Sequence, residues 1–345
     1  MMSTCSIVVY FIAIGWAVLT KAQQSDHLVV LSHGLHGSRH DLTYLADHLE
    51  KAGCLVLRSS ANEMLNSHVG VHAGGMKLAD EVWNFLYLHS GVRRISFVGN
   101  SLGGLFARYA VKELFDEPTG LIATLKPHHF LTIATPHLGV RNYTFFDEFG
   151  IQVPSQLKDL VARGMGRTGL DMLGDDPNQL GSDSLIYRMA TMHEFLEPLR
   201  AFQSRRLLAN LNLDLMVPLG TAAFLEHEEV LRLRAQHSEV PGIVQILTTH
   251  PVTPDMDLAQ SCADNQCANL DVKGSSNQLL PIDEMRKSLD QLGWIKVIVN
   301  FKGLFPMAHN QIAAVTKFTT EIDRLLGFHE GRYLIDKVAQ WLVSP

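Results

Sequence analysis

The sequence predicts an α/β fold, with a mostly parallel central sheet and helices on both of its faces. From residue 26 onward, short runs rich in β-branched residues alternate with amphipathic stretches of helical length. This alternation is typical of consecutive βαβ units, whose crossovers cover both faces of a sheet. Residues 28–32 (LVVLS) support this prediction, because a strand covered on both faces is continuously apolar instead of alternating.

The expected elements follow one another along the chain. We expect strands at residues 28–32, 54–58, 95–99, 130–134, 206–211 and 294–301. We expect helices at residues 41–51, 73–89, 102–115 and 311–326. Open α/β sheets bind their ligands at the carboxyl ends of the strands, so chemistry is expected in the loops that follow them.

We expect residues 26–345 to form one domain with two additions. Residues 141–199 hold helical pieces, glycines and prolines but no convincing strand, which predicts a helical cap insertion. Its apolar side chains, including Phe145, Phe146 and Phe149, either line an acyl pocket or form the core of a helical subdomain. Residues 236–291 are polar and proline-rich, and predict an irregular surface excursion.

Residues 1–25 form an apolar leader outside this fold. Residues 5–19 are nearly all apolar, but the run is shorter than the roughly 20 residues of a membrane span, and no Lys or Arg precedes it. Two interpretations stay open: a secretory or anchoring segment, or a nonstandard leader. The protein is secretory or membrane-associated under the first and cytoplasmic under the second.

Charge and cysteine content exclude several classes. The net charge of −6, with no dense run of Lys or Arg, argues against a nucleic-acid partner. Four cysteines are too few for a disulfide framework in 345 residues. Cys262 and Cys267 either pair in an oxidising compartment or are ordinary thiols. A zinc site there would need further ligands, and His250 is the only near candidate. Hydrolysis through a serine nucleophile implies neither a metal nor an organic cofactor.

Ser101 is the expected nucleophile. Residues 99–103 (GNSLG) match G-x-S-x-G between an expected strand and an expected helix. Gly99 and Gly103 leave room for the strained turn, and the helix dipole favours negative charge near the serine. The alternative is a glycine-rich turn with an N-capping serine.

The loop after the first strand is the expected oxyanion hole. Residues 33–37 read HGLHG, and glycines such as Gly34 let backbone N–H groups approach a substrate oxygen. We assign the donors to the N–H groups of Leu35 and Leu102, with His33 orienting the loop. The alternative is a flexible turn at the end of a strand.

The general base and its acid are chosen by chain position. In α/β folds with a G-x-S-x-G nucleophile, the chain order is serine, acid, histidine. His309 follows the last expected strand by a short loop, whereas its rival His329 lies between two helices. Asp214 follows an apolar segment (LLANLNL) and precedes Val217-Pro218. The weaker candidates are Asp171, Asp175, Asp176 and Asp183, expected on a solvated loop, and Asp255 and Asp257 in the excursion.

Taken together, these motifs resemble those of the lipase-like serine esterases, a family of the α/β-hydrolase superfamily. The likeness rests on VLSHGLHG at residues 30–37, GNSLGGLFARYA at 99–110, TPHLG at 135–139, GRTGL at 166–170, YRMA at 187–190 and LLANLNLDLMVP at 207–218. The resemblance implies the α/β-hydrolase fold and hydrolysis of lipid-like carboxylic esters by a Ser-Asp-His triad.

Position by position, the resemblance places that triad on Ser101, Asp214 and His309, the residues that the order of elements also selects. His137 in TPHLG is expected to have a structural role near the site, with substrate contact as the alternative. The expected partner is a lipid or small ester, with association to a lipid surface. Two other functions stay open: an acyltransferase with the same triad, and a non-catalytic lipid-binding module.

Overall fold

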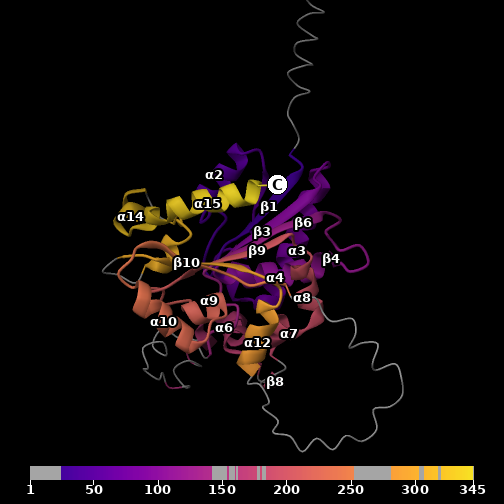
Figure 1. The fold of residues 1–345 in the computed structure, drawn as a ribbon. Helices are drawn as coiled ribbons and strands as arrows, with labels where there is room; N and C mark the ends of the chain where they lie inside the picture. The colour runs from indigo at the N-terminus through magenta and orange to yellow at the C-terminus, as the bar shows by residue number, and fades with distance from the viewer. Residues whose placement is uncertain are drawn as a thin grey trace, which may run out of the picture.

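In the computed structural model, a seven-stranded sheet forms the centre of the molecule (Figure 1). The structure describes residues 25–141, 154, 160, 162–176, 179–180, 184–251, 281–302, 307–317 and 320–344. The strands are β1 (His27–Ser32), β2 (Leu55–Arg58), β3 (Arg94–Asn100), β6 (Lys126–Ile133), β9 (Ser204–Asn210), β10 (Gly242–Thr248) and β11 (Ile295–Asn300). Their order is β10-β11-β9-β6-β3-β1-β2, and every neighbouring pair is parallel except β10 and β11. The prediction of an α/β-hydrolase fold is confirmed.

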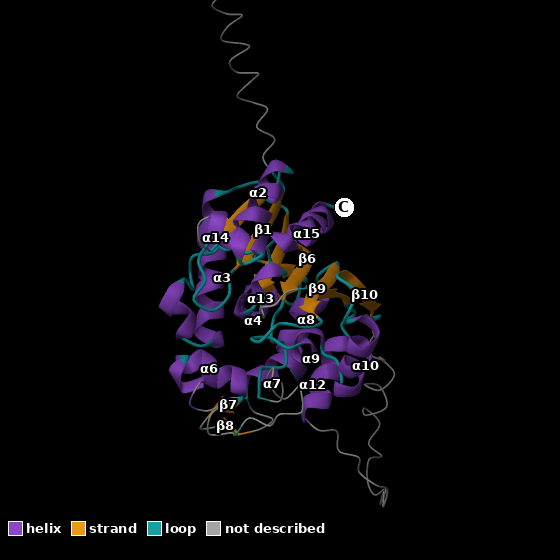
Figure 2. Cartoon of the chain, turned by 90° about the vertical axis from the view of Figure 1, so that its left-hand side faces the viewer, coloured by secondary structure: helices purple, strands orange, loops and turns teal. Residues whose placement is uncertain are grey.

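Helices cover both faces of this sheet. The longer ones are α2 (Thr43–Lys51), α3 (Val71–Leu88), α4 (Leu102–Leu114), α6 (Gly166–Leu173), α8 (His193–Arg200), α10 (His227–His237), α12 (Pro281–Asp290) and α15 (Arg332–Val343). The shorter ones are η1 (Met64–His68), α7 (Leu185–Thr191), α9 (Leu219–Ala223), α13 (Ala308–Gln311), α14 (Thr320–Leu325) and η3 (Phe328–Gly331). Figure 2 shows α6, α7 and α12 together at the end of the molecule away from α2. Among the described helices, none is long and apolar enough to cross a membrane.

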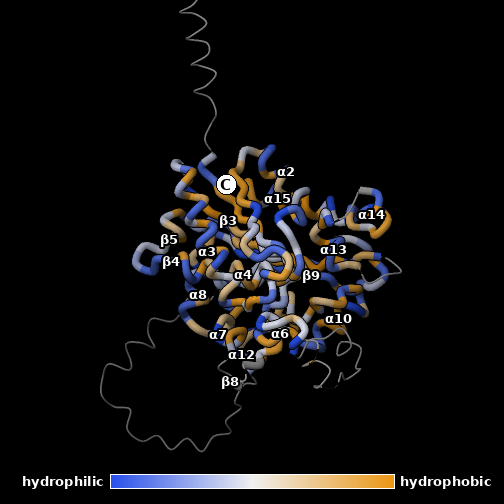
Figure 3. The backbone as a smooth tube through the Cα atoms, turned by 180° about the vertical axis from the view of Figure 1, so that it is seen from behind, coloured by the Kyte–Doolittle hydropathy of each residue, from blue (hydrophilic) through white to orange (hydrophobic). Residues whose placement is uncertain are grey.

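The alternation of side chains along β1 divides the core into two layers. Leu28 and Val30 pack in one cluster with residues of α3 and α4, whereas Val29 and Leu31 pack in the other with residues of α2 and α15. Hydrophobic stretches accordingly lie along β3 in the interior, whereas the loop beside β4 (Phe115–Asp116) is hydrophilic (Figure 3). Two buried faces explain why the strands read as continuous apolar runs.

Two expectations about the second half of the chain are wrong. The excursion expected at residues 236–291 contains a strand, β10, whose half-exposed side chains hide it from a search for buried runs. The single helix expected at residues 311–326 is interrupted between α13 and α14. Ala314 adopts a left-handed conformation there, and the N–H of Thr316 donates to the Asp41 carbonyl at 2.9 Å, which draws the chain away from the helical path.

Several features expected from the sequence lie outside the described residues. These are most of the apolar leader, the pair Cys262 and Cys267, and the phenylalanines at 145, 146 and 149. Aspartates 183, 255 and 257 lie outside them as well.

Buried histidines lie near the amino ends of the strands. His27 Nε2 is 2.7 Å from Ser96 Oγ, and His129 Nδ1 is 2.7 Å from Ser204 Oγ. Burial, with the neighbouring His128, lowers the pKa of His27 to about 3 and the pKa of His129 to about 4. Both imidazoles are therefore neutral in the folded chain at ordinary pH.

We expect the free energy of unfolding to fall as the pH drops below 6.5. Unfolding restores the ordinary histidine pKa of 6.5, so the unfolded chain takes up protons that the folded chain refuses. Stability is complete above pH 6.5 and declines toward pH 3–4, by roughly 1 kcal/mol per histidine at pH 5.5. Urea unfolding at pH 7.5 and 5.5 measures this loss of stability in the wild type and in His27→Gln, and the loss should be smaller in the variant. An equal loss in the wild type and the variant would contradict the lowered pKa of His27.

Candidate active site

Ser101 lies in a sharp turn between β3 and α4. Its φ of 55° and ψ of −129° belong to the left-handed half of the backbone map, which non-glycine residues rarely occupy. The Ser101 N–H donates to the Ile133 carbonyl at 2.8 Å, and its carbonyl accepts from Thr135 Oγ1 at 2.9 Å. The end of β6 therefore holds the strained turn in place.

Glycines beside Ser101 permit the close packing of this turn. A side chain on Gly99 would overlap the backbone of Gly104, and one on Gly103 would overlap the carbonyl oxygens of Ser32 and His33. The second overlap shows that the start of α4 rests directly on the end of β1. These contacts agree with the steric role expected for the two glycines of the motif.

The structure brings together the three residues expected to form the triad. His309 Nε2 is 2.9 Å from Ser101 Oγ, and His309 Nδ1 is 3.0 Å from Asp214 Oδ2. All three side chains are buried, with at most 7% of any of these residues exposed. They form one hydrogen-bonded chain from hydroxyl to carboxylate, as general-base activation of a serine requires.

Each oxygen of the Asp214 carboxylate has two hydrogen-bond partners. Oδ1 accepts from the N–H groups of Met216 (3.1 Å) and Val217 (2.8 Å), and Oδ2 accepts from Asn210 Nδ2 (2.7 Å) besides facing His309. These four hydrogen bonds fix the orientation of the carboxylate.

Asn210 is a member of this network that the sequence reasoning missed. It ends β9, four residues before Asp214, and is buried. A polar residue at the end of the apolar run LLAN, four residues before Asp214, was the available signal. The loop that carries Asp214 and the short helix that carries His309 are joined by a bridge between Asp214 and Met307.

The HGLHG loop of residues 33–37 lies against the nucleophile. A Cβ atom on Gly34 would lie 2.8 Å from Ser101 Cβ, so the loop backbone passes directly beside the serine. Within the described residues, the Leu35 N–H donates to no backbone carbonyl. Leu102 begins α4, where N–H groups have no partner inside the helix. His33 is buried, with Nδ1 3.0 Å from the Gly34 carbonyl.

We expect Gly34→Ala to lower kcat by about tenfold or more. The added methyl would press on Ser101 Cβ at 2.8 Å, and either the serine or the loop must shift. Ester hydrolysis by the purified variant measures the effect, and Gly164→Ala is the control, because nothing lies within 4 Å of a Cβ there and its φ is not positive. Equal kcat values for Gly34→Ala and the wild type would contradict the close approach.

His137 contacts buried residues that are not part of the triad. Its Nε2 is 2.9 Å from Thr132 Oγ1, and the buried Arg108 donates to its carbonyl at 3.1 Å. Burial, together with the nearby Arg108, lowers the pKa of His137 well below its ordinary value. The ring packs edge-on against Trp294 and is fully buried, which agrees with the expected structural role.

The rival acid and base candidates lie elsewhere. His329 is in η3, and none of its described contacts reaches Ser101. Asp171 was expected on a solvated loop, and this is wrong: it is buried in α6, where its Oδ2 accepts from the Val71 N–H at 2.8 Å. Asp175 and Asp176 form the two-residue strand β7 (Asp175–Asp176), paired with β8 (Gln179–Leu180).

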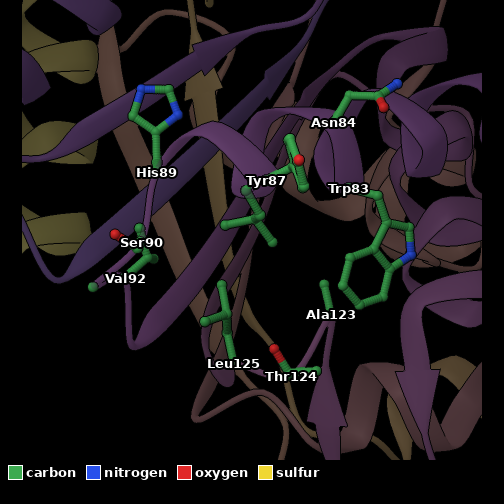
Figure 4. A pocket seen from close by; sticks show the side chains of 11 residues that line it. Trp83, Asn84, Tyr87, His89, Ser90, Val92, Ala123, Thr124 and Leu125 are labelled. Atoms are coloured by element: carbon green, nitrogen blue, oxygen red, sulfur yellow. The ribbon is translucent and has the colours of Figure 1, made fainter.

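A pocket of about 590 Å³ lies beside the end of α3, and Figure 4 shows the side chains that line it. It is lined by the end of α3, including Trp83 and Tyr87, and by Val92 and Leu125. Val92 precedes β3 and Leu125 precedes β6, so this pocket lies at the amino ends of the strands, whereas Ser101 lies at the carboxyl end of β3. The pocket is therefore separate from the triad.

Comparison with known families and curated proteins gives consistent similarities. The sequence profile of a family described as "Putative serine esterase (DUF676)" matches residues 22–225, which include Ser101 and Asp214 but not His309. The chain is 32% identical over 223 residues to "Putative lipase ROG1" of Saccharomyces cerevisiae, covering 62% of this chain and 31% of that protein. It is 29% identical over 241 residues to "Putative lipase C4A8.10" of Schizosaccharomyces pombe, covering 66% and 29%. The chain thus spans about a third of the length of these curated relatives.

The solved structures that match this chain are more distant. They include phospholipase PlaB from Legionella pneumophila, with 16% identity and a TM-score of 0.35 over 55% of this chain and 40% of that one. Another is the Pyrococcus furiosus esterase Pf2001, with 16% identity and a TM-score of 0.34 over 60% and 68%.

Proposed function

We propose that this chain, which belongs to the family described as "Putative serine esterase (DUF676)", hydrolyses carboxylic esters of lipid-like substrates through an acyl-enzyme on Ser101. The observation that carries the proposal is the hydrogen-bonded chain from Ser101 Oγ through His309 to Asp214. The names of the relatives, as lipases, support the choice of a lipid-like ester.

The proposed reaction begins with attack of Ser101 Oγ on the ester carbonyl carbon. His309 Nε2, 2.9 Å away, accepts the hydroxyl proton as the C–O bond forms, and Asp214 stabilises the resulting imidazolium through Nδ1. The carbonyl oxygen becomes an oxyanion, which accepts hydrogen bonds from the N–H groups of Leu35 and Leu102. His309 then returns the proton to the departing alcohol.

Water completes the reaction in a second, equivalent half. His309 takes a proton from the water as it attacks the acyl carbon, and the released Ser101 oxygen recovers that proton. The carboxylic acid leaves and the enzyme returns to its starting state. These steps use only side chains and backbone groups of this chain.

We further propose that residues 26–345 form one domain in which helices α6, α7 and α8 belong to a cap over the site. Helix α6 contacts η1 and α7, and α8 contacts α4, the helix that follows Ser101, which supports this arrangement. Association with a lipid surface would bring such a cap to its substrate, and remains part of the proposal.

A graded ester series tests the proposed function. The purified chain is incubated with p-nitrophenyl esters of two to sixteen acyl carbons, with Ser101→Ala as the control. We expect release of p-nitrophenol that rises with chain length and is lost in Ser101→Ala. Activity confined to two- and four-carbon esters would contradict the lipid-like substrate, and no activity on any ester would favour the non-catalytic alternative.

Product analysis distinguishes hydrolysis from acyl transfer. Both reactions release p-nitrophenol, so the acyl product is identified in the presence of an added long-chain alcohol. Free fatty acid as the main product is the expected result. A new ester as the main product would instead make this chain an acyltransferase.

A further inference from the structure

We infer that Thr168, in the GRTGL segment of residues 166–170, positions the oxyanion loop through Ser67 and His36. The inference rests on the proposed function and adds a residue that does not touch the triad. It also gives a role to the GRTGL segment, which takes no part in the proposed reaction.

The Thr168 side chain joins α6 to η1. It is fully buried, and its single hydroxyl donates to the Ser67 carbonyl at 2.7 Å and accepts from the Gly70 N–H at 2.9 Å. The hydroxyl therefore holds the backbone on both sides of the junction between η1 and α3. One turn later on α6, Asp171 Oδ2 accepts from the Val71 N–H at 2.8 Å, which fixes the first residue of α3.

Ser67 carries this constraint to the oxyanion loop. Its Oγ is buried, accepts from the His36 N–H at 3.0 Å and donates to the Met64 carbonyl at 2.5 Å. The Met64 N–H donates in turn to the Gly37 carbonyl at 3.0 Å. The loop is thus bound to η1 at two successive residues, both directly after the proposed donor Leu35.

His36 shows why this loop needs such support. Its φ of 52° lies in the left-handed region, which is strained for a residue with a side chain. The bond from its N–H to Ser67 Oγ holds that conformation, and its ring contacts the ring of His68, with centroids 4.6 Å apart. A change at η1 would therefore relax His36 and move the adjoining N–H of Leu35.

Glycines allow α6 to approach η1 closely enough for these bonds. Gly166 has a φ of 62°, and a Cβ there would lie 3.0 Å from the His68 carbonyl oxygen. A Cβ on Gly70 would lie 2.6 Å from Arg167 Cγ. The GRTGL segment thus combines a hydroxyl, a salt-bridged arginine and small residues at one helix contact.

The expected consequence is on the chemical step. Loss of one oxyanion donor lowers kcat by about 10²–10³-fold. A donor that is displaced but still present should cost a part of that, so we expect about tenfold for the loss of the Thr168 hydroxyl. The KM value should change little, because the displaced Leu35 N–H donates to an oxyanion that forms only in the transition state.

The experiment compares Thr168→Val with Thr168→Ser in the full chain. Valine keeps the shape and removes both hydrogen bonds, whereas serine keeps the hydroxyl. We expect Thr168→Val to lower kcat on a p-nitrophenyl ester by about tenfold with KM within about twofold of the wild type. Thr168→Ser should recover most of the lost kcat.

Thr221→Val is the matched control. Thr221 is also fully buried, and its Oγ1 also bridges two backbone groups, donating to the Gly139 carbonyl at 2.7 Å and accepting from the Leu138 N–H at 3.1 Å. It does not contact the HGLHG loop. We expect a comparable loss of stability in urea, with kcat within about threefold of the wild type.

The outcomes separate the inference from the proposed function. A folded Thr168→Val with wild-type kcat, or an equal fall in kcat in Thr221→Val, would overturn the inference and leave the esterase proposal intact. If Thr168→Val does not fold, Ser67→Ala tests the same link, and wild-type kcat in that variant would overturn it. A wild-type chain that hydrolyses no ester would contradict the proposed function itself.

Discussion

Ser101→Ala is expected to lower kcat for ester hydrolysis by at least about 10⁴-fold while the chain stays folded. The substitution removes the atom that attacks the ester, and His309 Nε2 then has no hydroxyl to deprotonate. The backbone should tolerate alanine, because the position already holds a non-glycine residue at a φ of 55°. Residual hydrolysis would come from the oxyanion donors and from binding alone.

Initial rates on a p-nitrophenyl ester measure this effect, and urea unfolding verifies the fold. Ser204→Ala serves as the control, since Ser204 lies at the amino end of β9 and its hydroxyl contacts His129. That variant should hydrolyse esters at a rate close to the wild type. A folded Ser101→Ala with a kcat within tenfold of the wild type would exclude Ser101 as the nucleophile.

Asp214→Asn is expected to lower kcat by about 10⁴-fold, because it fixes the wrong tautomer of His309. The backbone N–H groups of Met216 and Val217 both donate to Oδ1, so the amide oxygen of an asparagine would occupy that side. Its NH₂ group would then face His309 Nδ1, which must become the acceptor. The ring proton would move to Nε2, and His309 could no longer take the proton of Ser101.

The same initial-rate assay measures this second effect. Asp26→Asn is the control, since it neutralises an exposed aspartate paired with Arg94 at 3.0 Å. We expect that variant to keep wild-type kcat. A folded Asp214→Asn with more than about a tenth of the wild-type kcat would show that another group orients His309.

Much of the fold and the nucleophile turn could be predicted because their signals are local. The turn at Ser101 is encoded within five residues, and the strand and helix beside it are continuous patterns. His309 lies far from Ser101 in sequence, but the fixed order of strands places it at the same edge of the sheet. Its proximity to Ser101 and Asp214 agrees with that reasoning, while its role as general base stays a prediction.

Other features depend on neighbours that no local pattern reveals. Asn210 matters because Asp214 folds back toward it, and Thr168 matters because α6 lies on η1, about a hundred residues earlier in the chain. Strand β10 lies at the edge of the sheet and pairs only with β11 in it. Its side chains are therefore half-exposed, and it lacks the continuously buried pattern of the inner strands. In each case the contact that defines the residue's role is made by a distant segment.

Covalent labelling with a fluorophosphonate tests the central claim most directly. The probe phosphonylates an activated serine, and mass spectrometry of the digested protein locates the adduct. We expect one adduct, on the peptide that contains Ser101, formed rapidly in the wild type and absent from Ser101→Ala. Labelling that persists in Ser101→Ala, or an adduct on another serine of the wild type, would contradict the assignment of Ser101 as the nucleophile.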